Sequence, residues 1–202
     1  RNEKIKYFFK KNKKKIISVI IFLLIILVSS YSYDKYTTNK KIGISEKYNS
    51  IIIDYSGDEK IDTLKNLIEI IKIKDPTYSP LSLYFIIDNN LLDNEEQINA
   101  FFDILIEETS LDEEIKNLTL YKKALFNADN ILEGDLLKML NPLINSESVW
   151  NSHALYLIAE YFYSNEQKEK SKEFFNKIIS LENSNTQIRQ SAKKRLNRDL
   201  SD

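Results

Sequence analysis

The chain has 202 residues, with 29 Lys and Arg against 30 Asp and Glu, one histidine and no cysteine. The lack of cysteine excludes disulfides, thiolate nucleophiles, cysteine-bound metals and a lipid-modified cysteine. The net charge of -1 hides an asymmetry, because residues 1–15 carry eight basic side chains and one acidic one, which leaves residues 16–202 acidic. An acidic domain is poorly suited to nucleic acid, whose phosphates must be neutralised by Lys and Arg.

The first predicted element is the apolar run from Ile16 to Tyr33, which holds 18 residues without a formal charge. Because a helix rises about 1.5 Å per residue, roughly 17–25 such residues cross a bilayer core, so the run predicts one transmembrane helix. The basic cluster in residues 1–15 predicts a cytoplasmic tail, since positive charge stays inside. The rest of the chain is then expected outside the cytoplasm, with Tyr31, Tyr33 and Tyr36 at the outer headgroup level.

A cleaved secretory signal peptide is the alternative interpretation of this segment. It has a basic start, an apolar core of suitable length and a small-residue cleavage site at Val28-Ser29-Ser30. No Ala-x-Ala is present and the bulky Tyr31 and Tyr33 follow at once, which favours an uncleaved anchor. Both interpretations send the rest of the chain across the membrane.

Residues 34–41 are polar and predict a short linker, and residues 42–202 predict a helical domain. Glycine and proline are rare there, and apolar residues recur at three- and four-residue spacings. Helix start signals include Ser79 before Pro80, Asn94 before two glutamates, and Ser110 or Asp112 before two more. The pattern predicts an all-α domain with helices at 42–55, 60–74, 80–91, 94–109, 112–127, 131–144, 148–164, 166–181 and 186–199.

The predicted helices repeat in pairs. Leu83-Tyr84, Leu120-Tyr121 and Leu155-Tyr156 recur at spacings of 37 and 35, and each is followed by a helix with a doubled bulky pair. A paired-helix unit of about this length is typical of a tetratricopeptide-like solenoid, in which each pair completes its core by stacking on its neighbours. We therefore predict an α-solenoid of about four helix pairs, closed by a capping helix at 186–199 whose basic residues, Arg195 among them, face solvent.

The last helix pair resembles the tetratricopeptide family, which places small and aromatic residues at fixed positions on both helices. The matching residues are Ala154, Ala159, Phe162, Ser171 and Phe175. The earlier pairs depart from the pattern, with Ile87 and Ile98 where the family prefers Ala or Gly.

The whole layout, including the stretch from Asp75 to Tyr84, resembles bacterial single-pass inner-membrane proteins with a periplasmic tetratricopeptide-like domain. These proteins are similar to the ancillary subunit of the Sec translocon and its alphaproteobacterial relatives. The resemblance implies a bacterial inner-membrane protein with its N-terminus in the cytoplasm and residues 42–202 in the periplasm. It also implies contact with the Sec translocon, periplasmic chaperones or exported client proteins.

The repeat register predicts a binding surface on the concave face of the solenoid. Aromatic residues suit such a surface because they bury a large area and keep a polar tip. The alternative is that the repeated tyrosines seal the packing between helices. The predicted groove residues are Tyr84, Tyr121 and Tyr156, with Asp88, His153, Glu160 and Tyr163 nearby.

Catalytic patterns are scarce in this sequence. His153 is the single histidine, and the adjacent glutamate pairs diverge around their helices where a catalytic pair must converge. A phosphate-binding glycine loop and a nucleophile elbow are also missing. We therefore expect no enzyme activity, cofactor, metal or small-molecule substrate.

The expected function is that of a membrane-anchored scaffold or adaptor for other proteins, associated with protein export or envelope chaperones. Two alternatives remain open. One is a structural envelope-assembly or division factor that acts by self-association, and the other is a signal-cleaved soluble periplasmic protein with the same repeats.

Overall fold

The computed structural model describes residues 2–57 and 59–200. Within these ranges all regular secondary structure is helical, which confirms the predicted all-α class. The chain divides into two compact units, Arg1–Ile53 and Asp54–Asp202, which are described separately.

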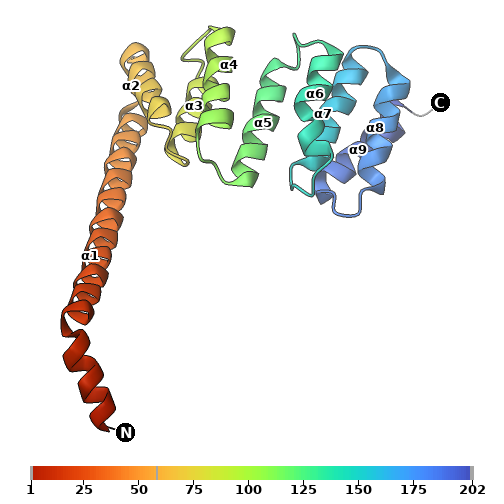
Figure 1. Cartoon of the computed structure of the whole chain (residues 1–202). Coiled ribbons are helices and arrows are strands. Elements are labelled where there is room, and N and C mark those ends of the chain that lie inside the picture. Colours follow the sequence, from red (N-terminus) through yellow and green to blue (C-terminus); the bar gives the residue numbers. More distant parts are fainter. Residues whose placement is uncertain (1, 58, 201–202) are drawn as a thin grey trace. The chain divides into compact units, whose positions relative to one another are not determined.

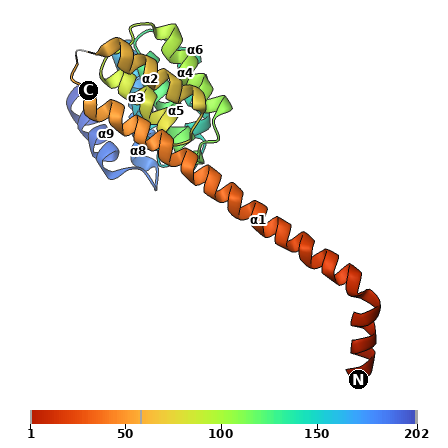
Figure 2. The ribbon, with the colours of Figure 1, turned by 90° about the vertical axis from the view of Figure 1, so that its left-hand side faces the viewer.

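The first unit is formed by the long helix α1 (Asn2–Asp54), which Figure 2 shows along its length. The predicted transmembrane segment lies inside it, and so do residues 34–41. The expected linker at 34–41 is therefore corrected, since these residues are helical. The reason is that the segment is polar but contains neither glycine nor proline, and polar residues alone do not end a helix.

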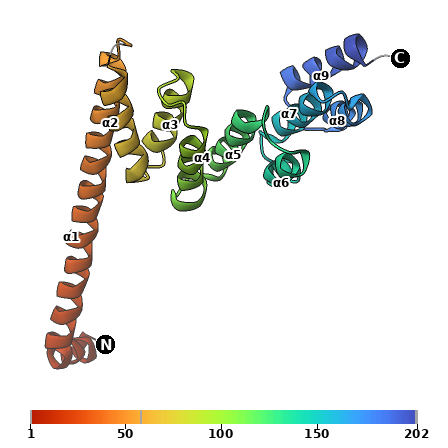
Figure 3. The same ribbon diagram turned by 90° about the horizontal axis from the view of Figure 1, so that it is seen from above.

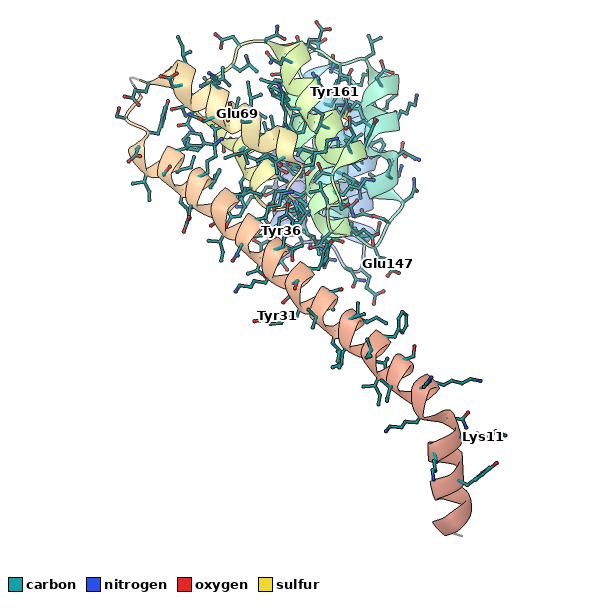
Figure 4. All side chains as sticks on the ribbon, turned by 60° about the vertical axis from the view of Figure 1, so that its left-hand side comes forward. Lys11, Tyr31, Tyr36, Glu69, Glu147 and Tyr161 are labelled. Carbon is teal, nitrogen blue, oxygen red and sulfur yellow. The ribbon has the colours of Figure 1, made fainter. Side chains whose placement is uncertain are left out.

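The apolar part of α1 has no cover within the protein. The side chains of residues 20–28 are all between 47% and 65% exposed, and Tyr31 and Tyr33 are 71% and 70% exposed. Figure 4 shows Lys11, Tyr31 and Tyr36 standing out from α1. The helix is long and apolar enough to cross a membrane, although an N-terminal signal sequence has the same properties. The prediction of one membrane-spanning candidate near the N-terminus is confirmed at this level.

The second unit holds the remaining helices, which Figure 1 labels and Figure 3 shows from above. Their bounds agree with the predicted helices from residue 60 onward to within a few residues, apart from one π-helical turn, η1, that continues α4. The elements are α2 (Lys60–Ile73), α3 (Tyr78–Asp88), α4 (Glu95–Asp103), η1 (Ile104–Glu108), α5 (Glu113–Asn127), α6 (Glu133–Ile144), α7 (Asn151–Ser164), α8 (Lys168–Ser180) and α9 (Thr186–Asp199).

Each helix of this unit packs against the helix that follows it in the chain, from α2 to α9. In addition, α5 contacts α7, and α7 contacts α9. Short connections therefore place consecutive helices side by side. In the C-terminal part of the unit, α5, α7 and α9 also contact one another in order.

The predicted helix start signal is confirmed for α4 and wrong for α3. Asn94 accepts a hydrogen bond from the Gln97 amide at 2.8 Å and caps α4 as predicted. Ser79 is not a cap, because its hydroxyl donates to the Ile70 carbonyl at 2.8 Å across the α2–α3 turn. The carboxylate of Asp75 does the capping work, accepting from the amides of Thr77 and Tyr78 at 2.9 and 2.8 Å.

The core of the C-terminal half of the second unit consists of two clusters of buried residues, one containing Phe162 and the other Phe175. Phe162 of α7 is 1% exposed and packs with leucines of α6, while Phe175 of α8 is fully buried. Ala154, Ala159 and Ser171 are also fully buried. Small side chains at these positions let α7 and α8 approach closely, which explains the intimate packing of this pair.

Candidate protein-binding site

The structure brings the seven predicted groove residues together in three separate groups. The first lies on α3, the second links α5 to α7, and the third lies under α9. The groups are Tyr84 with Asp88, Tyr121 with His153, and Tyr156 with Glu160 and Tyr163.

Tyr84 is fixed between α3 and α5. Its hydroxyl shares a 2.9 Å hydrogen bond with the hydroxyl of Thr119, and the ammonium of Lys122 lies 4.4 Å from the centre of its ring. Burial raises the pKa of Tyr84 above its usual value, and the Thr119 hydrogen bond opposes this only in part. Tyr84 therefore links α3 to α5, and it also borders a pocket.

The pocket beside Tyr84 has a volume of about 150 Å³ and lies between α3, α4 and α5. Its walls are mostly apolar, and Leu125 is 50% exposed at its mouth. Two charged side chains, Asp88 and Lys122, border it. The complete lining is Tyr84, Ile87, Asp88, Phe102, Lys122, Leu125 and Phe126.

Tyr121 and His153 form an aromatic cluster with Trp150. The rings of Tyr121 and Trp150 are stacked with centroids 5.7 Å apart, and the His153 ring lies 5.9 Å from the first and 5.0 Å from the second. Burial raises the pKa of Tyr121. The His153 Nδ1 atom is buried and has no hydrogen-bond partner among the described residues. The cluster seals the contact between α5 and the start of α7.

The third group is closed by the C-terminal helix. Arg195 of α9 donates to both carboxylate oxygens of Glu160, at 2.7 and 2.5 Å, and its guanidinium lies 4.1 Å from the centre of the Tyr163 ring. Burial, and then the hydrogen bond with Glu160, raise the pKa of Tyr156 to about 12. The expectation that Arg195 faces solvent was wrong, because its side chain is 17% exposed and pairs with Glu160 of α7.

All three tyrosines therefore take part in contacts between helices. Tyr84 reaches Thr119, Tyr121 reaches Trp150, and Tyr156 packs edge-on against Phe175 with ring centroids 5.4 Å apart. These contacts favour the interpretation in which the tyrosines seal the packing. The exposed apolar opening next to Tyr84 is the part of the predicted surface that remains available for binding.

Sequence reasoning missed the residues that make this opening. Leu125 and Lys122 both lie on α5 beyond Tyr121. Lys122 is the next residue, and Leu125 follows one helical turn after Tyr121. Leu125 is 50% exposed and lines the pocket together with residues of α3 and α4. The lone tryptophan was the one available signal for the aromatic cluster.

The described residues contain no group of three or more His, Asp or Glu side chains arranged to hold a metal ion. The polar groups around the pocket are one carboxylate, one ammonium and one phenol. The pocket can therefore surround an apolar group of a ligand and contact a charge next to that group.

No family model matches the sequence, and no curated protein or solved structure is significantly similar to it.

Asp199 gives a test of the ion pairs within α9, which include Arg195, the residue that pairs with Glu160 of α7. The hydrogen bonds from Arg198, at 2.7 and 2.8 Å, and a further one from Arg195 lower its pKa to about 2 from an ordinary 3.8. A lowered folded-state pKa stabilises the protein above the unfolded value, and this stabilisation is lost as the pH falls from about 4 to about 2. We expect Asp199→Asn to be less stable than the wild type at pH ~5 and to approach it by pH ~2.

Thermal unfolding in uncharged detergent micelles, followed by the fluorescence of Trp150, measures this difference. The control is Asp135→Asn, which removes an exposed carboxylate without a cationic partner in the described part of the chain. A constant gap between Asp199→Asn and the wild type across this pH range would show that ionisation of the Asp199 carboxyl does not stabilise the folded state.

Proposed function

We propose that this chain is a single-pass inner-membrane protein whose second unit is a tetratricopeptide-like repeat domain that binds other proteins in the periplasm. Protein export and its chaperones are the setting that the sequence resemblance favours. The proposal combines three observations: the periodicity of contacts in the second unit, the exposed apolar helix, and the open apolar pocket.

The observation that carries the proposal is the recurrence of polar contacts one repeat apart. In a stacked repeat each unit touches only its neighbours, so contacts should recur at the repeat length. Seven residue pairs of the second unit are joined by hydrogen bonds at separations of 33 to 37 positions. They are Lys74–Glu108, Tyr84–Thr119, Glu114–Ser148, Ser152–Asn185, Glu133–Gln167, Glu160–Arg195 and Glu133–Lys170. The pairs Asp103–Lys123, Asn99–Asn127 and Ile131–Tyr161 have shorter separations of 20, 28 and 30 positions.

The contacts of α5 with α7 and of α7 with α9 support the same arrangement. In a solenoid of helix pairs, the first helix of each pair meets the first helix of the next. Helix α9 then has the place of a first helix without a second, which is how a terminal cap ends a repeat array.

The first unit supports the membrane part of the proposal. An exposed run such as residues 20–28 is unfavourable in water and favourable in lipid. The tyrosines that follow it suit the headgroup layer, and the basic residues before it favour a cytoplasmic N-terminus. An anchor of this kind holds a binding domain at the membrane surface, where exported chains emerge.

Photo-crosslinking in intact cells tests this function. We expect p-benzoylphenylalanine in place of Leu125, at the pocket, to capture exported proteins or export chaperones that mass spectrometry identifies. The matched control is the same group in place of Leu132, which is 74% exposed and outside the pocket. Equal capture from both positions, or no capture from position 125, would contradict the proposed binding site. A product containing two copies of this chain would instead favour self-association.

A further inference from the structure

We propose that the pocket between α3, α4 and α5 binds one bulky apolar side chain of an extended protein segment that carries lysine or arginine beside it. This inference rests on the proposed function, because it names the kind of segment that the protein-binding surface takes. It assigns the pocket a ligand chemistry from its size, its lining and the charges around it.

The size of the pocket fits one large side chain. An engineered apolar cavity of about 150 Å³ lined by aliphatic and aromatic residues is known to bind benzene. The pocket here has about the same volume and a floor formed by Ile87, Phe102 and Phe126. A phenylalanine ring or a leucine side chain entering it would cover Leu125, which is otherwise 50% exposed.

The walls are held in place without a ligand. Phe102 is fully buried and its ring lies 6.1 Å from that of Phe126, while the 2.9 Å hydrogen bond to Thr119 fixes Tyr84. A pocket that is already formed saves the entropy of ordering its side chains when a ligand binds. The pocket is therefore ready for an anchor side chain.

The charges around the pocket favour a cationic neighbour for that anchor. The carboxylate of Asp88 is exposed at the rim, and no described cation lies within salt-bridge distance of it. Residues 88–147 carry 14 Asp and Glu against the lysines at 116, 122, 123 and 138. Of the two lysines nearest the pocket, Lys122 lies over the Tyr84 ring and Lys123 pairs with Asp103. Lys122 also borders the pocket, but the acidic excess of this segment and the Asp88 carboxylate at the rim favour lysine or arginine beside the anchor.

Fluorescence anisotropy with the full chain in uncharged detergent micelles tests the proposal. The probes are three labelled peptides, Ser-Lys-Phe-Lys-Ser, Ser-Glu-Phe-Glu-Ser and Ser-Lys-Gly-Lys-Ser. We expect the first to bind about tenfold or more tightly than either of the others, since only it supplies both the apolar anchor and the cations. Its affinity should fall as salt rises from about 50 mM to about 500 mM.

Two variants locate the binding. Leu125→Ser should weaken the Lys-Phe-Lys peptide by about tenfold, and Asp88→Asn should weaken it less and reduce its salt dependence. The controls Leu132→Ser and Asp135→Asn, on exposed residues outside the pocket, should leave its affinity unchanged. The Trp150 fluorescence spectrum verifies that each variant is folded.

Equal binding of the lysine and glutamate peptides, unchanged binding by Leu125→Ser, or no binding of the Lys-Phe-Lys peptide would overturn the inference. Its failure is distinguishable from failure of the proposed function. If position 125 captures exported proteins in cells but the peptides give any of these results, the protein-binding function stands. Only the proposed preference for an apolar side chain beside lysine or arginine is then rejected.

Discussion

Replacing Leu24 and Leu27 together by arginine is expected to abolish membrane integration. Both side chains lie in the exposed apolar part of α1, at 54% and 65% exposure, one helical turn apart. Each arginine near the centre of a spanning helix costs about 2.5–3.5 kcal/mol during insertion, so the pair costs about 5–7 kcal/mol. Within residues 2–57 and 59–200, α1 is the one helix long and apolar enough to span a membrane, so the cost falls on this segment.

Carbonate extraction of membranes measures the effect. The wild type should stay in the membrane pellet and the double arginine variant should leave it, while Leu24→Ala with Leu27→Ala should behave like the wild type. The mass of the intact protein decides between anchor and signal peptide, because cleavage after residue 30 would remove the segment altogether. Retention of the double arginine variant in the pellet would contradict a spanning α1.

Phe162→Ala is expected to have the largest effect on the stability of the second unit. Its ring is 1% exposed, stacks on Phe174 at 5.5 Å and has the Lys170 ammonium 4.9 Å from its centre. Removal of a buried phenylalanine typically costs about 3–5 kcal/mol, a large part of the roughly 5–15 kcal/mol that stabilises a domain. Leu132→Ala, on a side chain 74% exposed, should change the free energy of unfolding by less than about 0.5 kcal/mol.

Chemical unfolding followed by Trp150 fluorescence measures both variants, because Trp150 packs against the same core cluster as Phe162. Hydrogen exchange adds a test of the repeat arrangement. If contacts are confined to neighbouring repeats, Phe162→Ala should raise exchange in α6, α7 and α8 far more than in α2 and α3. A uniform increase over all these helices would argue against a stacked repeat.

The sequence was a good guide to helices and a poor guide to their surfaces. Apolar spacing located the helices from residue 60 onward because it reflects which side is buried. The linker at 34–41 was misread because polar composition signals solvent exposure and does not signal a helix end. Ser79 was misread as a cap because its hydroxyl can also donate to a carbonyl across a turn, as it does to Ile70.

The binding site was harder to predict, because a rotation of a helix by a fraction of a turn decides whether a side chain lines a groove or packs against a neighbouring helix. Tyr84, Tyr121 and Tyr156 recur in the sequence whether they line a groove or seal a packing contact. The contacts with Thr119, Trp150 and Phe175 favour the packing interpretation. Leu125 could not be singled out, because a leucine in an amphipathic helix is ordinarily expected to be buried and its 50% exposure is visible only in the folded structure.

The proposed binding of proteins in the periplasm requires the second unit to lie outside the cytoplasm. The chain has no native cysteine, so a single introduced cysteine can be labelled without background from the chain itself. The two variants are Asn12→Cys, in the basic segment, and Asp135→Cys, on an exposed position of α6. In intact spheroplasts a membrane-impermeant maleimide should modify the cysteine at position 135 at once, and the one at position 12 only after detergent is added. Labelling of position 12 with protection of position 135 would contradict a domain tethered outside the cytoplasm.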